Sequence, residues 1–253
     1  MNKKEKIKKL VIQLSLLVSL IIIWELAAKF KIIDSFLFSS PSKIFKTLIV
    51  YISNGEIFKH IFVSLFETIV GLIVGCFLGI FLAMILWYFP YVQKILSPFL
   101  IVFNALPKTA LAPILIIWVG TDIDGIIVVA VSIFIVMTLI TALTGFNQIE
   151  DDKIKMMLSF KASRTKILLK LVLPANLINI ISLVKVNIGL TWVGVIVAEF
   201  LVSKAGIGYL ILYGTQVFKM DIVMMGIFVL AVLSFIMYEI LNIIEKNLIK
   251  RRS

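Results

Sequence analysis

Residues 68–93 read TIVGLIVGCFLGIFLAMILWYFPYVQ, a run of 26 residues without a formal charge. A helix needs about 20 apolar residues to cross the hydrocarbon core of a bilayer, so this run is long enough to span a membrane. Uncharged runs also occupy residues 10–24, 125–149 and 222–238. These four runs predict four transmembrane helices.

Two weaker segments, residues 97–120 and 176–201, each carry one lysine. We count both as spans, which predicts an all-α polytopic membrane protein with six transmembrane helices. The composition agrees, because 61% of the residues are hydrophobic, only 15% are charged and the mean hydropathy is +1.13. Apolar residues make up about half of a soluble domain.

Basic residues are unevenly placed along the chain. The two termini, Lys94 and the segment 153–170 hold 16 of the 25 lysines and arginines. Because positive charge collects on the cytoplasmic side, both termini are expected in the cytoplasm. We therefore predict a cytoplasmic basic N-terminus (1–9) and a single transmembrane domain (10–253) with a cytoplasmic loop at about 147–175. The first span lacks a clear small-x-small cleavage site, which favours an uncleaved helix over a signal peptide.

Several classes of site are unsupported by the sequence. His60 is the one histidine and Cys76 the one cysteine, so no familiar metal-ligand spacing is present and no catalytic residues are predicted. We expect His60 in a solvated loop and Cys76 as a packing residue. The chain has no phosphate-binding GxxxxGK[ST] motif, and its basic residues are not interleaved with aromatics in the way that predicts nucleic-acid binding. No cofactor is expected in this chain.

Within the second span, Gly71, Gly75, Gly79 and Ala83 recur every four residues. This spacing leaves one helix face without large side chains and predicts close packing against another helix. Upstream, Ser64 and Glu67 have the spacing of an N-terminal capping box. If the helix starts earlier, Glu67 instead faces a cavity or the interface.

The third span is interrupted by Pro107, Lys108 and Pro113. Proline removes a backbone donor, and such a break is tolerated in a bilayer only where protein or water satisfies the freed groups. The span is therefore expected to line a cavity. Lys108 either extends to the membrane interface or takes part in the pathway.

The segment between the fourth and fifth spans is too polar to cross a membrane. Asp151 and Asp152 are plausible helix starters, and Ser163 can cap a second helix that stops near Pro174. In the first helix, Ile154, Met157, Leu158 and Phe160 crowd one side. Such a helix either lies on the membrane surface or inserts into a groove on a partner protein.

Residues 155–211 resemble the inner-membrane permease subunit of binding-protein-dependent ABC importers, in particular the nitrate, sulfonate and taurine type. The family's cytoplasmic motif is EAA, three residues, G, nine residues, I-x-L-P. Its frame falls here on Lys155, Met156, Met157, Lys161, Leu171, Leu173 and Pro174, with "KASRTK", "VAEF", "KAGIGYLI" and "LPKTALAPILIIWVG" as further matches. The likeness covers about residue 36 to the C-terminus.

The resemblance implies a type I importer permease in a bacterial cytoplasmic membrane. It implies a dimer, two ATPase subunits that hydrolyse ATP, and an extracytoplasmic binding protein that delivers a small solute. The cytoplasmic loop becomes the coupling helix, with these ATPase-coupling candidates: Lys155, Met156, Met157, Phe160, Lys161, Ala162, Ser163, Arg164 and Pro174. The sequence departs from the motif because EAA reads Lys-Met-Met and the glycine is Lys161.

Pathway or gating candidates are Pro107, Lys108, Pro113, Lys185, Trp192 and Glu199. Ionisable residues inside a span are costly and mark functional positions. Lys185 either attracts an anion or serves packing or gating. Glu199 is expected to hold the SKAGIGY loop, and Glu25 and Glu239 to be solvated at the interface. The alternative function is an ion-gradient-driven secondary transporter that uses Glu67, Glu199 or Lys185 as a proton carrier.

Overall fold

The computed structural model describes residues 3–252, and five helices within that range are long and apolar enough to cross a membrane. They are α1 (Lys3–Lys29), α4 (Glu56–Tyr88), α7 (Ile123–Asn147), α10 (Leu173–Val202) and α12 (Met220–Arg252). A sixth span exists if α5 (Pro90–Ala105) and the helices after it count as one broken span. The all-α fold with six spans is confirmed in this sense. Residues 3–9 of the predicted basic N-terminus lie in the first turns of α1.

The third span breaks where its prolines predict. α5 ends at Ala105, and the η1 turn (Lys108–Leu111) and α6 (Ala112–Val119) continue at an angle of 83° to it. Pro107 precedes η1, and Pro113 lies in the first turn of α6, where a missing N–H is tolerated. Lys108 Nζ donates to the carbonyl and the side-chain oxygen of Asn104, each at 3.2 Å, near the C-terminal end of α5.

The second span differs from its prediction at both ends. α4 begins at Glu56 and ends at Tyr88, because Pro90 starts α5 two residues later. Ser64 and Glu67 consequently lie in the interior of α4, so the capping-box interpretation is wrong and the alternative, a helix that starts earlier, holds. The charged residues in the first three turns of α4 interrupt the apolar run, so the run alone predicts a helix that starts too late.

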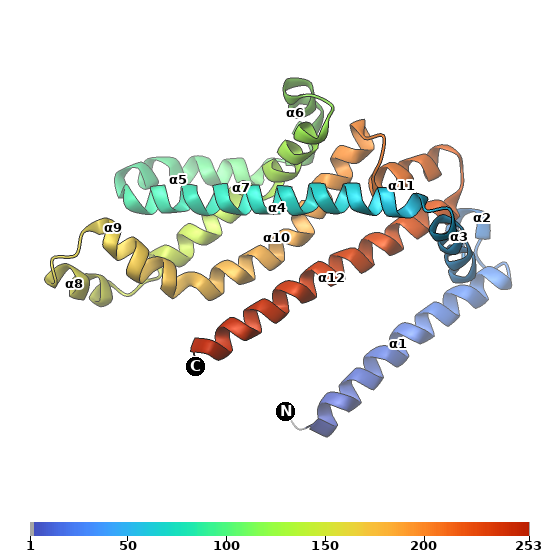
Figure 1. Ribbon diagram of the computed structural model, residues 1–253, viewed down its shortest axis with the longest axis horizontal. Helices are drawn as coiled ribbons and strands as arrows, with labels where there is room; N and C mark the ends of the chain where they lie inside the picture. The colour runs from blue at the N-terminus through green and yellow to red at the C-terminus, as the bar shows by residue number, and fades with distance from the viewer. Residues whose placement is uncertain (1–2, 253) are drawn as a thin grey trace.

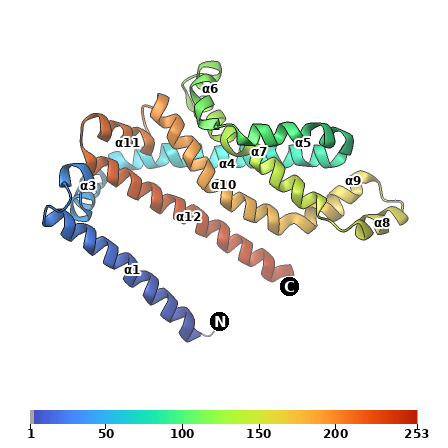
Figure 2. The same ribbon diagram turned by 180° about the vertical axis from the view of Figure 1, so that it is seen from behind.

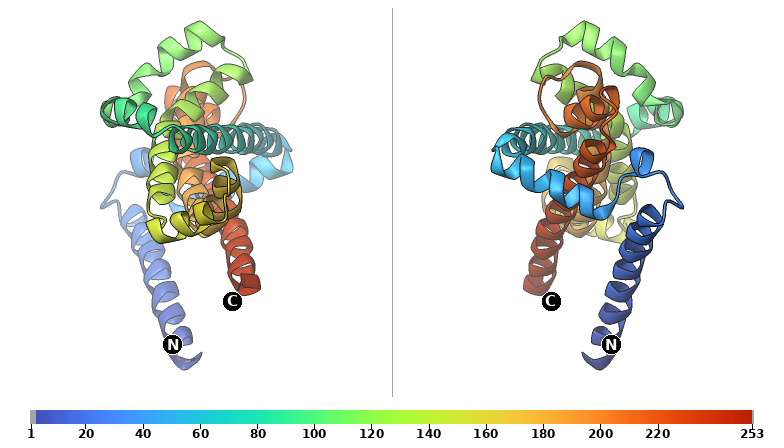
Figure 3. Two further views of the ribbon diagram at one scale, coloured as in Figure 1. Left: turned by 90° about the vertical axis from the view of Figure 1, so that its left-hand side faces the viewer. Right: turned by 90° about the vertical axis from the view of Figure 1, so that its right-hand side faces the viewer.

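Most of the short helices lie at the two ends of the molecule, whereas α6 projects from its side (Figure 1). α2 (Ser35–Phe38), α3 (Pro41–Ser53) and α11 (Ile207–Gln216) lie at one end, called here the α11 end. α8 (Asp151–Ser159) and α9 (Arg164–Ile167) lie at the other, called the α8 end. Figures 2 and 3 show that both chain termini leave the helix bundle on the same side.

Helices α4, α7 and α10 form the centre of the bundle. The small-residue face of α4 lies against α7: a Cβ on Gly75 would fall 2.3 Å from the Phe134 ring, and one on Gly79 would fall 2.7 Å from Thr138. Gly71 faces Thr191 of α10 and Ala130 of α7. Close backbone approach of this kind supplies dispersion contacts that replace the hydrophobic effect inside a bilayer.

α9 runs without a stop through a π-helical turn (Leu168–Val172) into α10. The prediction that the helix stops near Pro174 is therefore wrong. Proline has no N–H for the usual bond to the carbonyl four residues earlier, and a widened π turn just before it absorbs the mismatch. Pro174 then lies in the first turn of α10.

α1 diverges from the rest of the bundle and contacts it near the α11 end (Figure 1). Glu25 there accepts hydrogen bonds from the backbone N–H (2.9 Å) and hydroxyl (2.8 Å) of Ser42 in the first turn of α3. Glu25 thus satisfies orphan donors at a helix start. The prediction that Glu25 is simply solvated at the membrane interface is therefore incomplete.

Candidate functional site

The α8 end presents an exposed apolar surface on a short, well-defined segment. Phe160 is 76% exposed, and Leu158 and Met156 are 54% and 52% exposed. Met157 and Ile154 instead turn inward and pack against a core cluster of α4, α7 and α10. Of the apolar coupling candidates, Phe160 and Met156 are thus accessible and Met157 is half-buried.

Lys161 lies just after the end of α8 and adopts a left-handed conformation, with φ +55°. Its N–H donates to the Leu158 carbonyl at 2.8 Å, and the Ala162 N–H donates to the Met157 carbonyl at 3.1 Å. This pair of bonds is a Schellman motif, whose left-handed residue is usually glycine. Lys161 therefore adopts the conformation that the family's motif glycine provides.

Ser163 begins α9 as its N-cap and accepts a hydrogen bond from the Lys166 N–H at 3.3 Å, as predicted. Arg164 turns back toward the end of α4. Its guanidinium donates to the Trp87 carbonyl at 3.1 Å and lies over the Trp87 ring, 5.4 Å from the ring centre. Arg164, one of the coupling candidates, thus joins the loop to α4.

Both lysines of α8 form local ion pairs. Lys155 contacts Asp152 at 3.3 Å and Lys153 contacts Glu150 at 3.0 Å, and all four side chains are exposed. Exposed pairs of this kind contribute at most about 1 kcal/mol each. The apolar side chains, rather than the charges, are what distinguish this surface.

The centre of the bundle holds a buried polar network. The Asn187 amide donates to Thr138 Oγ1 at 2.8 Å and to Cys76 Sγ at 3.3 Å, so three helices are joined. Trp192 is only 3% exposed, and its Nε1 has no partner among the described residues. The structure places Trp192 inside this helix bundle rather than on an open surface.

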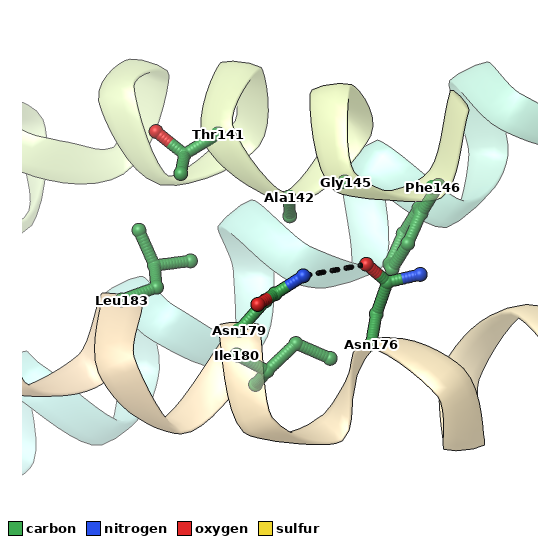
Figure 4. Close-up of a pocket in the computed structure, with 8 residues that line it drawn as sticks. All are labelled: Thr141, Ala142, Gly145, Phe146, Asn176, Asn179, Ile180 and Leu183. Atoms are coloured by element: carbon green, nitrogen blue, oxygen red, sulfur yellow. Dashed lines mark hydrogen bonds between the residues drawn. The ribbon is translucent and has the colours of Figure 1, made fainter. Parts of the chain in front are cut away.

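A small cavity lies between α7 and α10, beside Asn176, Asn179 and Gly145 (Figure 4). Asn179 donates to the side-chain oxygen of Asn176 at 3.3 Å. The cavity measures about 20 Å³, which is room for about one water molecule. It is too small to hold a solute.

Lys185 forms an ion pair with Glu245 of α12. Ser182 donates to the same carboxylate at 2.8 Å, and the Lys185 ammonium lies 5.6 Å from the Tyr238 ring centre. Among the roles predicted for Lys185, this geometry supports helix packing. The partner, Glu245, was missed because a charge near the C-terminus resembles an ordinary solvated residue.

At the α11 end, Glu199 joins three parts of the chain. Ser64 Oγ and the Gly208 N–H each donate to its carboxylate at 2.5 Å, and the Ile207 N–H donates to Ser64 at 2.7 Å. Gly206, with φ +118°, approaches so closely that a Cβ there would lie 2.4 Å from the carboxyl carbon. Glu199 thus contacts the SKAGIGY loop that it was expected to hold.

His60 also contacts this loop. The Gly206 N–H donates to its Nδ1 at 3.0 Å, and its ring stacks on Tyr209 with centres 5.8 Å apart. The prediction of a solvated loop residue is wrong, because α4 begins before His60 and carries it against α11. The spacing of His60, Ser64 and Glu67 on one helix face was the signal in the sequence.

Comparison with known proteins identifies the class. A model of the binding-protein-dependent transport system inner membrane component family matches residues 75–250. The chain belongs to this family. It is a permease of the ABC importer class, and nothing in the comparisons supports an ion-gradient-driven secondary transporter.

Three relatives of the permease are named for different solutes. The putative aliphatic sulfonates transport permease protein of Bacillus subtilis (strain 168) is 27% identical, over 92% of this chain and 85% of its own. The taurine transport system permease protein of Escherichia coli (strain K12) is 22% identical, over 95% and 90%. The riboflavin transport system permease protein of Chloroflexus aurantiacus is 25% identical, over 92% and 87%.

Proposed function

We propose that two copies of this permease form the translocation pathway of an ATP-driven importer for a small sulfonate-like anion. Two separate ATPase subunits hydrolyse the ATP, and a binding protein delivers the solute from outside. Relatives named for sulfonates and taurine support this solute class, whereas those named for riboflavin and formylaminopyrimidine support a vitamin or vitamin precursor as the second candidate. Both termini and α8 face the cytoplasm of a bacterial cell. The chain carries no catalytic residue or cofactor and binds no nucleic acid.

The exposed apolar surface formed by Met156, Leu158 and Phe160 is the observation that carries this proposal. Large apolar side chains gathered on one short segment favour burial in a protein groove, since each buried side chain contributes about 1.5–3 kcal/mol. We infer that an ATPase subunit supplies this groove.

The contacts of the α8 loop with the spans support a coupling role. Arg164 joins the loop to the end of α4, and Met157 packs into the core between the helices. A docked ATPase changes the balance between inward-facing and outward-facing states only if the loop is held differently in each. Because the loop contacts α4 and continues into α10, a change in how it is held can be transmitted to these membrane-spanning helices.

Replacement of Phe160 by Asp tests the docking. A charge in the centre of the interface is expected to weaken binding by at least about 30-fold, the effect of losing an interface hot spot of roughly 2 kcal/mol. The measurement is the amount of ATPase that co-purifies with the tagged permease after gentle detergent extraction. Phe218→Asp is the matched control, because Phe218 is 68% exposed at the opposite end. An unchanged ATPase ratio in the Phe160→Asp variant contradicts the docking proposal.

A further inference from the structure

α3 lies between two spans and is itself too short to cross a membrane. Its 13 residues, Pro41–Ser53, extend about 20 Å, whereas the hydrocarbon core of a bilayer is about 30 Å thick. Ile44 is buried against the bundle, but Phe45, Ile49 and Ile52, which share another face of the helix, are exposed. A helix with an exposed apolar face at the end of a membrane bundle lies in the interface between lipid headgroups and acyl chains. We therefore expect α3 to lie at the depth of the headgroups.

An open pocket of about 560 Å³ lies between α3 and the start of α12. Lys43 and Lys46 line it from α3, and Lys219 lines it from the turn before α12. The described lining includes one carboxylate, that of Asp221, which accepts a hydrogen bond from the Ser39 hydroxyl at 2.6 Å. The pocket therefore holds three ammonium groups against one carboxylate that already has a donor.

Two of the three lysines have no partner for their charge. Lys43 Nζ donates to Ser35 Oγ at 3.2 Å. Within residues 3–252, Lys46 and Lys219 form neither an ion pair nor a side-chain hydrogen bond. Charges of one sign in a hollow with low-dielectric walls focus the electric field and attract a counter-ion. The pocket thus favours an anion.

The neighbouring side chains indicate which anion fits. A lysine ammonium binds phosphate as a point charge, and the hydroxyls of Thr47 and Tyr51, which also line the pocket, can donate to phosphate oxygens. A free anion would occupy the pocket and leave the apolar face of α3 uncovered. A phospholipid matches both features, because its phosphate meets the lysines while its acyl chains cover apolar side chains. An acidic protein surface would match the charges alone.

We propose that this pocket binds the phosphate headgroup of one anionic phospholipid, with Lys46 and Lys219 as its principal contacts. The acyl chains lie along the exposed apolar face of α3, and the headgroup bridges α3 and α12. The inference goes beyond the proposed function, because it concerns a lipid that the permease holds and is independent of the solute.

Two lipids that differ in headgroup charge test the site. Dioleoylphosphatidylglycerol and dioleoylphosphatidylcholine share their acyl chains and phosphate, and only the first carries a net negative charge. We would titrate each lipid into the detergent-purified permease and count the lipids bound per chain by native mass spectrometry. One saturable phosphatidylglycerol per chain, bound at least about tenfold more tightly than phosphatidylcholine, is the expected result. Equal affinities for the two lipids overturn the proposal.

Variants identify the contacts. A lysine near an anionic surface contributes about fivefold to affinity, so Lys46→Gln/Lys219→Gln is expected to bind phosphatidylglycerol about 30-fold more weakly. Lys46→Arg/Lys219→Arg keeps both charges and is expected to bind within about twofold of the wild type. Lys59→Gln, an exposed change at the same end but outside the pocket, is the control and leaves the affinity unchanged. Wild-type affinity in the glutamine pair, or an equal loss in the arginine pair or in the control, contradicts the site.

Competition distinguishes the lipid from other occupants. Inorganic phosphate and glycerophosphoglycerol, the headgroup without acyl chains, are expected to leave phosphatidylglycerol bound when present at equal concentration. Displacement by either compound means that the pocket takes free anions, which overturns the lipid site. A glutamine pair that keeps its lipid but loses stimulation of the assembled importer's ATP hydrolysis by the binding protein also overturns it, in favour of a protein docking surface.

Discussion

At the scale of single residues, Lys161 adopts a backbone conformation that opposes its side chain. Its φ of +55° is needed to complete the Schellman motif at the end of α8. A side chain in this conformation costs about 1–2 kcal/mol relative to glycine, which adopts it freely. The departure from the family's motif therefore changes the residue without changing the turn.

Lys161→Gly is expected to stabilise the permease. Relief of about 1 kcal/mol corresponds to a rise of about 2–4 °C in the unfolding midpoint for a chain of this size. Thermal unfolding in detergent, followed by tryptophan fluorescence, measures the effect. Lys155→Gly is the control, because the same change within α8 loses helix propensity and lowers the midpoint. A midpoint that falls in both variants means that the left-handed turn carries no strain.

At the scale of elements, the contact between α4 and α7 depends on the absence of side chains. The Gly75 backbone lies so close to Phe134 that a methyl group would overlap the ring. Close-packed interiors respond to one additional carbon with strain or helix displacement.

Gly75→Ala is expected to destabilise the bundle by about 1–3 kcal/mol through overpacking. Gly189→Ala is the matched control in α10, since a Cβ at Gly189 meets nothing within 4 Å and the exposed helix position gains propensity. The two variants are compared by their denaturation midpoints in detergent. A midpoint for Gly75→Ala that equals or exceeds that of Gly189→Ala contradicts tight packing at this face.

At the scale of the whole molecule, the six-span arrangement sets which surfaces face which compartment. α8 and the turn that follows α10 lie at opposite ends (Figure 1). The distribution of basic residues favours the proposed orientation, in which the α8 end faces the cytoplasm. In this orientation the proposed docking surface for an ATPase faces the compartment that contains ATP.

Cysteine labelling checks this topology. In a Cys76→Ser background, Ser163→Cys is expected to react only when a membrane-impermeant thiol reagent reaches the cytoplasm. Asn54→Cys, in the exposed turn before α4, is expected to react from outside. The reverse pattern would overturn the orientation of all six spans.

The sequence was sufficient for properties that depend on local composition. Uncharged runs long enough to cross a bilayer predict the spans, prolines predict the break before Lys108, and a serine at residue 163 predicts a helix cap. The bare face of α4 also follows from spacing alone. The importer class was inferred from the order and spacing of motifs. Both can be read from a single sequence without knowledge of the fold.

Only the tertiary structure decided which distant side chains meet. Arg164 lies on Trp87, Lys185 on Glu245, and Glu199 on Ser64, pairs separated by 60 or more residues. Each pairing depends on the rotation of a helix about its axis and on its depth in the membrane. A span that is apolar on all sides leaves both undetermined by its hydrophobic pattern. The buried carboxyl groups of Glu67 and Glu199 are brought together in the same way. They meet because α4 and α10 pack against each other at this depth, which no local pattern in either span specifies.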